Sequence, residues 1–242
     1  MQLSDRRDVS NDGTGILGGC EVNLYRGHGN RARRTFDTYV RADDAPQSVL
    51  EIGCGYTTLF ALHALAENVR EHETLAQNTC REIERPEFFA VPHAPRMTCI
   101  DLYGHPRGTA ALAFAAAETL GLSRYLETHI VDFRGYAKAL DDALKPFDLV
   151  FLDCGGYENL HAFLQEYWPQ VNPNGGLVLV HSLLTNVEGI MILKELKLRQ
   201  ATQNFMDYEL VSILEPHKSW QNSVTILRRT TAYFDPIYSM SP

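Results

Sequence analysis

Between residues 48 and 202, short apolar runs alternate with longer segments in which apolar residues recur at helical spacing. Short apolar runs that stop at glycine or aspartate are typical of buried β-strands, and the longer periodic segments are typical of helices. The pattern predicts strands at residues 48–52, 97–100, 128–131, 148–152 and 177–180. It predicts helices at residues 57–67, 108–120, 136–144, 158–168 and 187–202, with a further helix around residues 30–41.

The last part of the chain breaks this alternation. Residues 208–214 and 223–229 both have strand character, and the connector between them is too short to hold a crossover helix. Two such strands pair as an antiparallel hairpin, whereas strands separated by helices pair in parallel. The predicted fold is therefore α/β: a Rossmann-like, doubly wound sheet, mostly parallel, with an antiparallel C-terminal hairpin strand.

The same pattern sets the expected domain boundaries. Residues 1–44 lack periodicity and are predicted to form an N-terminal arm or lid, residues 45–232 one enzyme domain, and residues 233–242 a tail. About thirty residues, 68–96, separate the first helix from the second strand and are interpreted as an insertion. An active-site lid, an oligomer contact and a plain surface insertion all stay open for it.

Composition narrows the class of protein. The chain has 242 residues and a net charge of −8, which argues against a nucleic-acid substrate, because phosphate backbones require clustered Lys and Arg. No apolar run is long enough to span a membrane, and the first fifteen residues lack the apolar core of a signal peptide. The five cysteines are scattered without a CxxC pair, which favours reduced thiols. We expect a cytoplasmic enzyme acting on a small molecule, and a homodimer is compatible with the arm and the insertion.

Polar residues follow the first four predicted strands where each strand ends. The first strand is followed by a glycine turn, Gly53-Cys54-Gly55, and the next three by Asp101, Asp132 and Asp153. In parallel α/β sheets, ligands bind at the carboxyl ends of the strands. A helix cap explains each aspartate taken alone, whereas all three together favour a ligand site.

Three stretches of the chain resemble the class I methyltransferases that use S-adenosylmethionine (SAM). The stretch from Val49 to Gly55 resembles their first motif, the stretch from Phe147 to Asp153 their fourth-strand motif, and the stretch from Asn172 to Val178 their turn before the fifth strand. The C-terminal hairpin also matches that fold. The resemblance covers roughly residues 45–230 and implies SAM as the cofactor.

The resemblance also implies residue roles. Gly53 and Gly55 would lie against the methionine part of SAM, Asp101 would hold the ribose hydroxyls, and Asp132 with Phe133 would face the adenine. The other predicted cofactor-binding residues are Glu51, Tyr56, Thr57, Leu102 and Asp153. For Glu51, anchoring the loop is the alternative to contacting the ligand.

The segment after the fourth strand is similar to the catechol-type O-methyltransferases, which bind a divalent metal with one Asp there and an Asp-Asn pair after the fifth strand. Here Asp153 is present, but His181-Ser182 replaces the pair, so we expect no catalytic metal. His181 becomes the candidate general base, because an unperturbed imidazole pKa of about 6.5 suits proton removal near neutral pH. A helix cap or strand-end role is the alternative for His181.

Five residues complete the predicted chemistry. Asp153 and Glu158 join His181 as catalytic candidates, by orienting a cationic acceptor or holding its proton, and Tyr25, Tyr157 and Ser182 are the candidate substrate-binding residues.

The acidic charge and the missing metal pair favour methyl transfer to a nitrogen, an amino or guanidino group of a small polar metabolite or amino acid. An O-methyltransferase with His181 as base is the alternative within this class. The alternatives outside it are an NAD-dependent oxidoreductase and a non-catalytic SAM-binding protein. Thr58, where dinucleotide-binding loops have a third glycine, argues against the NAD-dependent enzyme.

Overall fold

The structure is a computed structural model. It describes residues 14–17, 20–23, 46–77, 92–103, 108–202, 208–214 and 223–230. The predicted helix at 30–41, Tyr25, most of the arm, the middle of the insertion and the tail lie outside these residues. No helix in the described ranges is long and apolar enough to cross a membrane.

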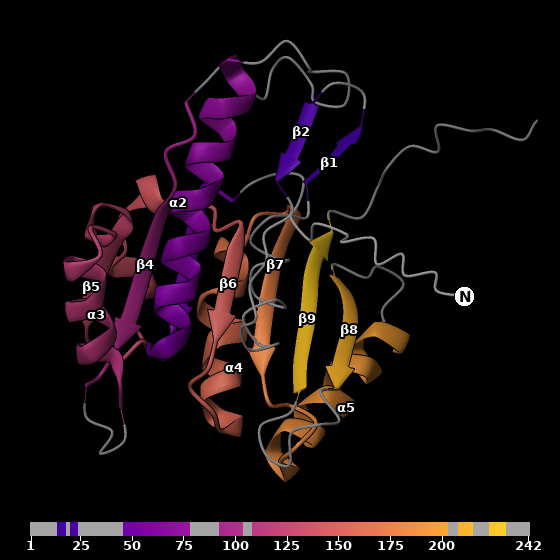
Figure 1. Cartoon of the computed structure of the whole chain (residues 1–242). Coiled ribbons are helices and arrows are strands. Elements are labelled where there is room, and N and C mark those ends of the chain that lie inside the picture. The colour runs from indigo at the N-terminus through magenta and orange to yellow at the C-terminus, as the bar shows by residue number, and fades with distance from the viewer. Residues whose placement is uncertain are drawn as a thin grey trace, which may run out of the picture.

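A seven-stranded sheet in the order β5-β4-β3-β6-β7-β9-β8 forms the centre of the molecule (Figure 1). The first five strands of this order are parallel, and β9 pairs antiparallel with both β7 and β8. The strands are β3 Ser48–Ile52, β4 Arg96–Asp101, β5 Leu126–Ile130, β6 Leu149–Leu152, β7 Asn174–His181, β8 Tyr208–Leu214 and β9 Ser223–Thr230. The predicted mixed sheet with a C-terminal hairpin is confirmed.

The helices lie on both faces of the sheet, as a doubly wound fold requires (Figure 1). They are α2 Tyr56–Gln77, α3 Ala110–Thr119, α4 Tyr157–Glu166 and α5 Val187–Thr202. Because side chains alternate along a strand, Val49 of β3 joins the core cluster under α2 and α3, whereas Leu50 joins the cluster under α4 and α5.

The predicted helix at residues 136–144 is wrong. The chain there makes two single 3₁₀ turns, Ala137–Ala139 and Asp142–Leu144. Leu140 adopts extended φ and ψ angles between them, and the Asp141 carboxylate accepts a hydrogen bond from the Ala143 N–H (2.9 Å), which starts the second turn. Ala137, Leu140 and Leu144 are buried at three- and four-residue spacing, which also suits a helix. This spacing is why the sequence pattern predicts a helix here.

Other differences concern element ends and the arm. Helix α2 continues to Gln77, ten residues beyond its predicted end, so the first part of the insertion is helical. Within the predicted arm, β1 Thr14–Leu17 and β2 Cys20–Asn23 pair antiparallel. Four-residue strands are too short to give a clear alternation, which is why the pattern predicted none there.

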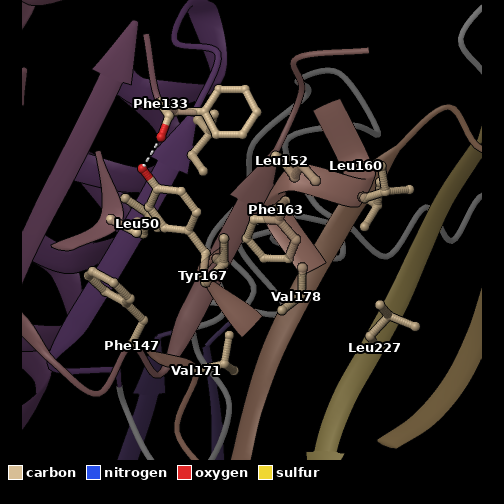
Figure 2. Close-up of a cluster of buried hydrophobic side chains, with 14 of the residues drawn as sticks. Leu50, Phe133, Phe147, Leu152, Leu160, Phe163, Tyr167, Val171, Val178 and Leu227 are labelled. Atoms are coloured by element: carbon tan, nitrogen blue, oxygen red, sulfur yellow. Dashed lines mark hydrogen bonds between the residues drawn. The ribbon is translucent and has the colours of Figure 1, made fainter. Parts of the chain in front are cut away.

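Tyr167, which follows α4, ties that helix to the segment after β5. Its side chain is fully buried, and its hydroxyl donates to the Phe133 carbonyl oxygen over 2.6 Å (Figure 2). Its ring stacks on Phe163 with centroids 6.0 Å apart. This contact fixes the loop after β5 relative to α4.

The C-terminal hairpin holds the loop that follows β7. The Ser182 N–H donates to the Ser223 carbonyl oxygen (2.8 Å), and the Leu184 N–H donates to Ser223 Oγ (3.0 Å). Ser223 is itself fully buried. The first residue of β9 therefore sets the conformation of the chain beside His181.

Candidate functional site

The carboxyl ends of the parallel strands bring most of the predicted residues to one edge of the sheet. Ile52 of β3 is in register with Ile100 of β4 and with Leu152 of β6, and Leu152 is in register with Val180 of β7. The residues that follow these four positions are Gly53, Asp101, Asp153 and His181. They consequently form a row across the edge.

Gly53 is required by its own backbone and by a neighbouring strand. Its φ is +83°, a value that L side chains rarely adopt, and a Cβ there would lie 2.3 Å from the Asp153 carbonyl oxygen. The loop after β3 thus packs directly on the end of β6. Gly55 is similarly close-packed, since a Cβ would lie 2.8 Å from Thr109 Oγ1.

Glu51 stabilises this loop from beneath. Its side chain is fully buried, and its two carboxylate oxygens accept hydrogen bonds from the hydroxyls of Thr57 (2.6 Å) and Thr58. Thr58 Oγ1 in turn accepts from the Gly55 N–H (3.1 Å). Burial raises the pKa of Glu51 to about 7. This geometry gives Glu51 and Thr57 a positioning role beneath the loop.

Asp101 closes the other side of the loop. Its Oδ2 accepts from the Cys54 N–H (2.9 Å) and its Oδ1 from the Tyr103 N–H (2.7 Å). The Asp101 side chain remains partly exposed, so the carboxylate can accept further hydrogen bonds at the sheet edge. Tyr56 and Leu102, both predicted to bind cofactor, are exposed by 68% and 59%.

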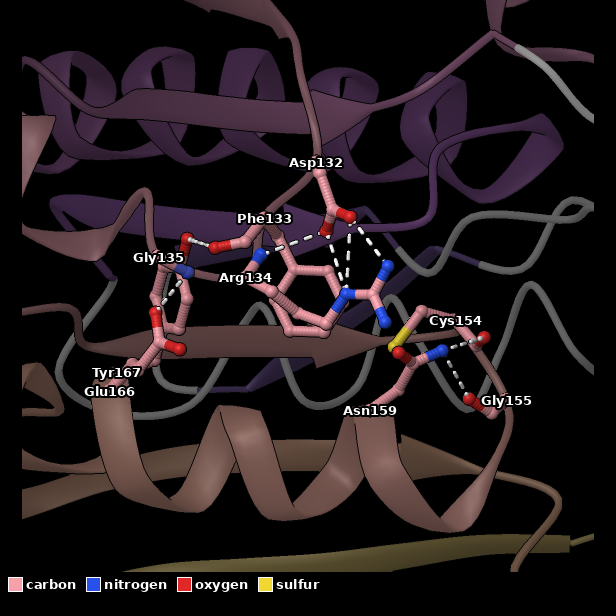
Figure 3. A network of polar contacts seen from close by, with 9 residues as sticks. All are labelled: Asp132, Phe133, Arg134, Gly135, Cys154, Gly155, Asn159, Glu166 and Tyr167. Atoms are coloured by element: carbon pink, nitrogen blue, oxygen red, sulfur yellow. Dashed lines mark hydrogen bonds and ion pairs between the residues drawn. The ribbon is translucent and has the colours of Figure 1, made fainter.

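Asp132 is already held by an arginine that the sequence analysis missed. Arg134 Nε and Nη2 donate to the two oxygens of Asp132 over 2.6–3.1 Å, and the Arg134 N–H donates to Oδ1 (3.0 Å) (Figure 3). These bonds hold the pKa of Asp132 below its usual range. A ligand amine that binds Asp132 would therefore share the carboxylate with Arg134 or displace the Arg134 side chain.

Phe133 is predicted to lie beside the adenine together with Asp132. Its side chain is buried in the core beside Tyr167, with only 7% of the residue exposed (Figure 2). The ring belongs to the core cluster that α4 and α5 cover, so it is used for packing. A contact between Phe133 and adenine would have to be made by the main chain.

Asp153, which follows β6, and His181, the last residue of β7, are in hydrogen-bond contact at this edge. Asp153 Oδ1 and His181 Nδ1 are 2.8 Å apart, and both side chains are partly accessible. The next residue, Ser182, has φ +63°, and its Oγ is buried without a hydrogen-bond partner in the described structure. Two of the three predicted catalytic residues are thus brought together by neighbouring parallel strands.

Glu158 and Tyr157 lie on α4 but take no part in this pair. Glu158 is exposed in the first turn, and its charge contributes to raising the pKa of Arg134. The Tyr157 hydroxyl donates to Glu195 of α5 (3.1 Å), so its side chain is directed toward α5. Tyr157 keeps a predicted substrate role without a contact that supports it.

A small pocket opens beside His181, between the starts of α4 and α5. Its volume is about 30 Å³, enough for roughly two water molecules. The lining includes apolar side chains, Leu152, Leu160 and Ile192, with Gly156, His181 and Asn186 at its polar side. Sequence periodicity does not reveal this pocket, because it arises between two helices from different crossovers.

Glu188 is a second residue that the sequence analysis missed. Although it belongs to α5, its Oε2 accepts from the Tyr157 N–H at the start of α4 over 2.9 Å. A carboxylate there satisfies an otherwise unpaired amide and complements the helix dipole. Asn159 closes the same loop by donating to the carbonyls of Cys154 and Gly155 (Figure 3).

The residues beside Asp153 do not fit an octahedral site for a hard divalent metal. Asp153 supplies one carboxylate, His181 already bonds to it, and the described residues offer no third Asp, Glu, His or Cys donor within reach of this pair. A buried trio, Glu51, Cys54 and Cys99, does bring its donor atoms within 4.8 Å of one another. There Cys99 bonds to Glu51 and Cys54 to the Ile100 carbonyl, so the groups satisfy one another or the main chain.

Comparison with protein families identifies the domain. Residues 50–183 match the family described as a methyltransferase domain, and this match covers more than half of the chain. No curated protein matches the chain.

Solved structures share the fold at low sequence identity. The O-methyltransferase TomG from Streptomyces achromogenes, involved in tomaymycin synthesis and solved with SAM, is 16% identical with a TM-score of 0.58, over 86% of this chain and 82% of that one. An O-methyltransferase from Bacillus cereus in complex with SAH, the demethylated product of SAM, is 12% identical with a TM-score of 0.54, over 84% and 82%. An rRNA methylase from Streptococcus thermophilus is 9% identical with a TM-score of 0.52, over 83% and 95%.

Proposed function

Since the chain belongs to the methyltransferase-domain family and is a SAM-dependent methyltransferase, we propose that it methylates a hydroxyl oxygen of a small molecule. The observation that supports an oxygen acceptor is the 2.8 Å contact between Asp153 and His181 at the carboxyl ends of β6 and β7. A hydroxyl must lose its proton as it is methylated, and a histidine oriented by a carboxylate is suited to take it.

The proton path follows from the ring atoms. Asp153 orients the imidazole through Nδ1, so that Nδ1 carries the proton of this hydrogen bond and Nε2 is the atom that takes the acceptor's proton. The acceptor oxygen then forms the new bond to the methyl carbon while the carbon–sulfur bond breaks. His181 becomes imidazolium, stabilised by the Asp153 carboxylate, and later releases the proton to water.

The chain's remaining contribution is alignment. SAM, when bound, supplies a methyl group on a positively charged sulfur, which is a good leaving group, so that proximity and orientation account for much of the acceleration. Asp101 and the loop held by Glu51 would position the cofactor. The Asp153 carbonyl packs against Gly53 of that loop, and the Asp153 side chain contacts His181. Asp153 would therefore link the cofactor to the acceptor.

A nitrogen acceptor is the second candidate, and a specific feature favours it. Asp153 and Glu158 place two exposed carboxylates at the start of α4, where they would attract a cationic amine or guanidine. A protonated amine must also lose a proton before attack. A nitrogen acceptor would depend more on these carboxylates than on an oriented imidazole.

Methyl transfer to a panel of phenols, alcohols, amines and guanidines, with purified wild-type enzyme and SAM, tests the proposal. We expect turnover of a hydroxyl compound, and a loss in kcat of about 100-fold or more in His181→Gln, the range for removal of a general base. SAM affinity should stay within a few fold, and turnover should survive a metal chelator. His63→Gln, on the half-exposed surface of α2, is the matched control and should keep full activity.

Two outcomes would contradict this proposal. Methylation of amines alone, with hydroxyl compounds untouched, would establish the nitrogen acceptor. Full activity of His181→Gln on a hydroxyl acceptor would show that His181 is not the general base.

A further inference from the structure

The small pocket beside His181 is walled mainly by buried apolar side chains. Leu152 ends β6, Val180 lies in β7, and Leu160 and Ile192 come from α4 and α5. These four residues are exposed by only 2–4%, and all belong to the core cluster in which Figure 2 shows Leu152 and Leu160. The pocket therefore extends from the row of strand-end residues into the core. We call it the α4–α5 pocket.

The polar groups around the α4–α5 pocket are already used in hydrogen bonds. Asn186 Oδ1 accepts from the Gly189 N–H (2.6 Å), and its Nδ2 donates to the Ser182 carbonyl oxygen (3.1 Å). On the other side, Asn159 donates to the carbonyls of the loop after β6 (Figure 3). The Cys154 thiol is neutral, because burial raises its pKa to about 12. These features favour an apolar occupant, since a polar group buried without a hydrogen bond is destabilising.

Charge gives the same result. Of the described residues that line the α4–α5 pocket, none is Lys, Arg, Asp or Glu. The carboxylates of Asp153 and Glu158 lie outside this lining, at the edge of the sheet and in the first turn of α4. The pocket thus differs in chemistry from the acidic surroundings of its opening.

The walls of the α4–α5 pocket are held at a fixed separation. Helix α5 begins directly against the loop after β7, because a Cβ on Gly189 would lie 2.5 Å from the Leu183 carbonyl oxygen. The start of α4 is tied to α5 by the hydrogen bond from the Tyr157 N–H to Glu188. The volume of about 30 Å³ corresponds to roughly two water-sized spaces, which is room for a group of one or two carbons. A tightly packed core resists widening, so a larger group would not fit.

The pocket also lies next to the reacting atoms of the proposed mechanism. His181 is part of its lining, and His181 Nε2 is the atom that takes the proton from the acceptor oxygen. An oxygen bonded to His181 consequently lies at the opening of the pocket. A substituent on the carbon next to the hydroxyl-bearing carbon is close enough to that oxygen to enter.

We propose that the α4–α5 pocket receives an apolar group of one or two carbons, which the acceptor carries on the carbon next to its hydroxyl-bearing carbon. The enzyme selects its acceptors by this group, and Val180 and Ile192 determine the size that is accepted. The inference rests on the proposed function, because that function places the reacting oxygen at His181. One methylene in a hydrophobic pocket changes kcat/KM by about 10–200-fold.

A series of phenols with wild-type enzyme and SAM tests the proposal. The compounds are phenol, 2-methylphenol, 2-ethylphenol and 2-tert-butylphenol, with the corresponding anilines as a parallel series. We expect kcat/KM to be about tenfold or more higher for 2-methylphenol or 2-ethylphenol than for phenol. For 2-tert-butylphenol it should fall below the value for phenol, because the branched group exceeds the pocket.

Two variants change the size of the pocket by one methylene each. Val180→Ile fills it and should lower the preference for 2-methylphenol over phenol by about tenfold. Ile192→Val enlarges it and should favour 2-ethylphenol over 2-methylphenol by a similar factor relative to the wild type. Ile100→Val is the matched control, because Ile100 belongs to the same core cluster but does not line the pocket, and it should leave both ratios unchanged. Each ratio compares two acceptors on the same protein, so a loss of folded protein does not alter it.

The outcomes separate this inference from the proposed function. Phenols that react without a preference for the substituent, or with ratios that neither pocket variant changes, would overturn the α4–α5 pocket as a specificity site and leave the oxygen acceptor in place. Methylation of the anilines alone would overturn the oxygen acceptor, and the same ratios within the aniline series would then decide for or against the pocket. Methylation of neither series, with another hydroxyl compound of the panel reacting, would overturn the pocket proposal.

Discussion

Glu51 couples the stability of the protein to pH. Its pKa is raised from 4.5 to about 7 by burial, so the folded state holds a proton that the unfolded chain releases between these values. Its contribution to stability is therefore full below pH 4.5 and is lost as the pH rises through about 7.

Glu51→Gln, which cannot ionise, should remove this pH dependence. Relative to the variant, the wild type should lose about 3 kcal/mol of unfolding free energy between pH 4.5 and pH 8, from the size of the shift. Urea unfolding of both proteins at several pH values measures the difference. Parallel profiles for the two proteins would show that Glu51 does not titrate in this range.

Substitutions at Gly53 and Gly121 allow the cost of a positive φ to be compared with the added cost of a steric clash. Both have positive φ, +83° and +67°, but only Gly53 would place a Cβ against another backbone, since nothing lies within 4 Å of that position at Gly121. Gly121→Ala should cost about 1 kcal/mol of unfolding free energy. Gly53→Ala should cost about 3 kcal/mol or more, with a loss of SAM affinity. Chemical unfolding and calorimetric titration with SAM measure both, and equal effects would contradict the contact with Asp153.

At the scale of elements, Arg229 joins β9 to the single 3₁₀ turn, Trp168–Gln170, that follows α4. Its Nη1 donates to the carbonyls of Trp168, Pro169 and Val171 over 2.6–3.1 Å, and its guanidinium lies 5.9 Å from the Trp168 ring centroid. The Trp168 carbonyl also accepts from the Val171 N–H (3.1 Å), and Arg229 supplies a charged donor to all three carbonyls.

Arg229→Ala should lower the free energy of unfolding by about 2 kcal/mol, because it leaves these carbonyls without their charged donor. The adjacent Arg228→Ala is the control. Arg228 is exposed and makes one long ion pair to Glu209 (3.4 Å), so its loss should change little. Thermal and chemical unfolding of the two variants gives the comparison, and an equal effect would refute this role of Arg229.

The elements also show where periodicity succeeds and where it fails. Helix α5 has its predicted bounds, Val187–Thr202, because its buried residues, Gly189, Ile192, Leu193 and Leu196, recur at helical spacing in a long segment. Residues 137–144 bury their apolar positions at nearly helical spacing, yet the extended Leu140 divides them into two turns. Hydrophobic spacing alone does not distinguish these cases, because the local hydrogen bond from Asp141 decides the second.

For the whole molecule, the sequence predicts the row of strand-end residues but not the contacts among them. Asp101, Asp153 and His181 could be placed at one edge because parallel strands share a direction. Glu188 could not be predicted as a partner of Tyr157, since it reaches another helix whose position depends on how the elements pack. Arg134 contacts Asp132 only two residues away, but hydrophobic periodicity does not describe the turn that brings the two side chains together. Burial of Phe133 likewise depends on Tyr167, thirty-four residues later in the chain.

The bonds from Ser223 to the loop after His181 have a consequence for protein synthesis. Chains fold as they emerge from the ribosome, starting from the N-terminal end. The strands that carry Gly53, Asp101 and Asp153 are complete well before β9 has been made. These candidate-site residues therefore wait on the order of seconds for the last strands, at translation rates of about 5–20 residues per second. A nascent chain that stops before residue 223 keeps the first half of the site and lacks the support for its histidine.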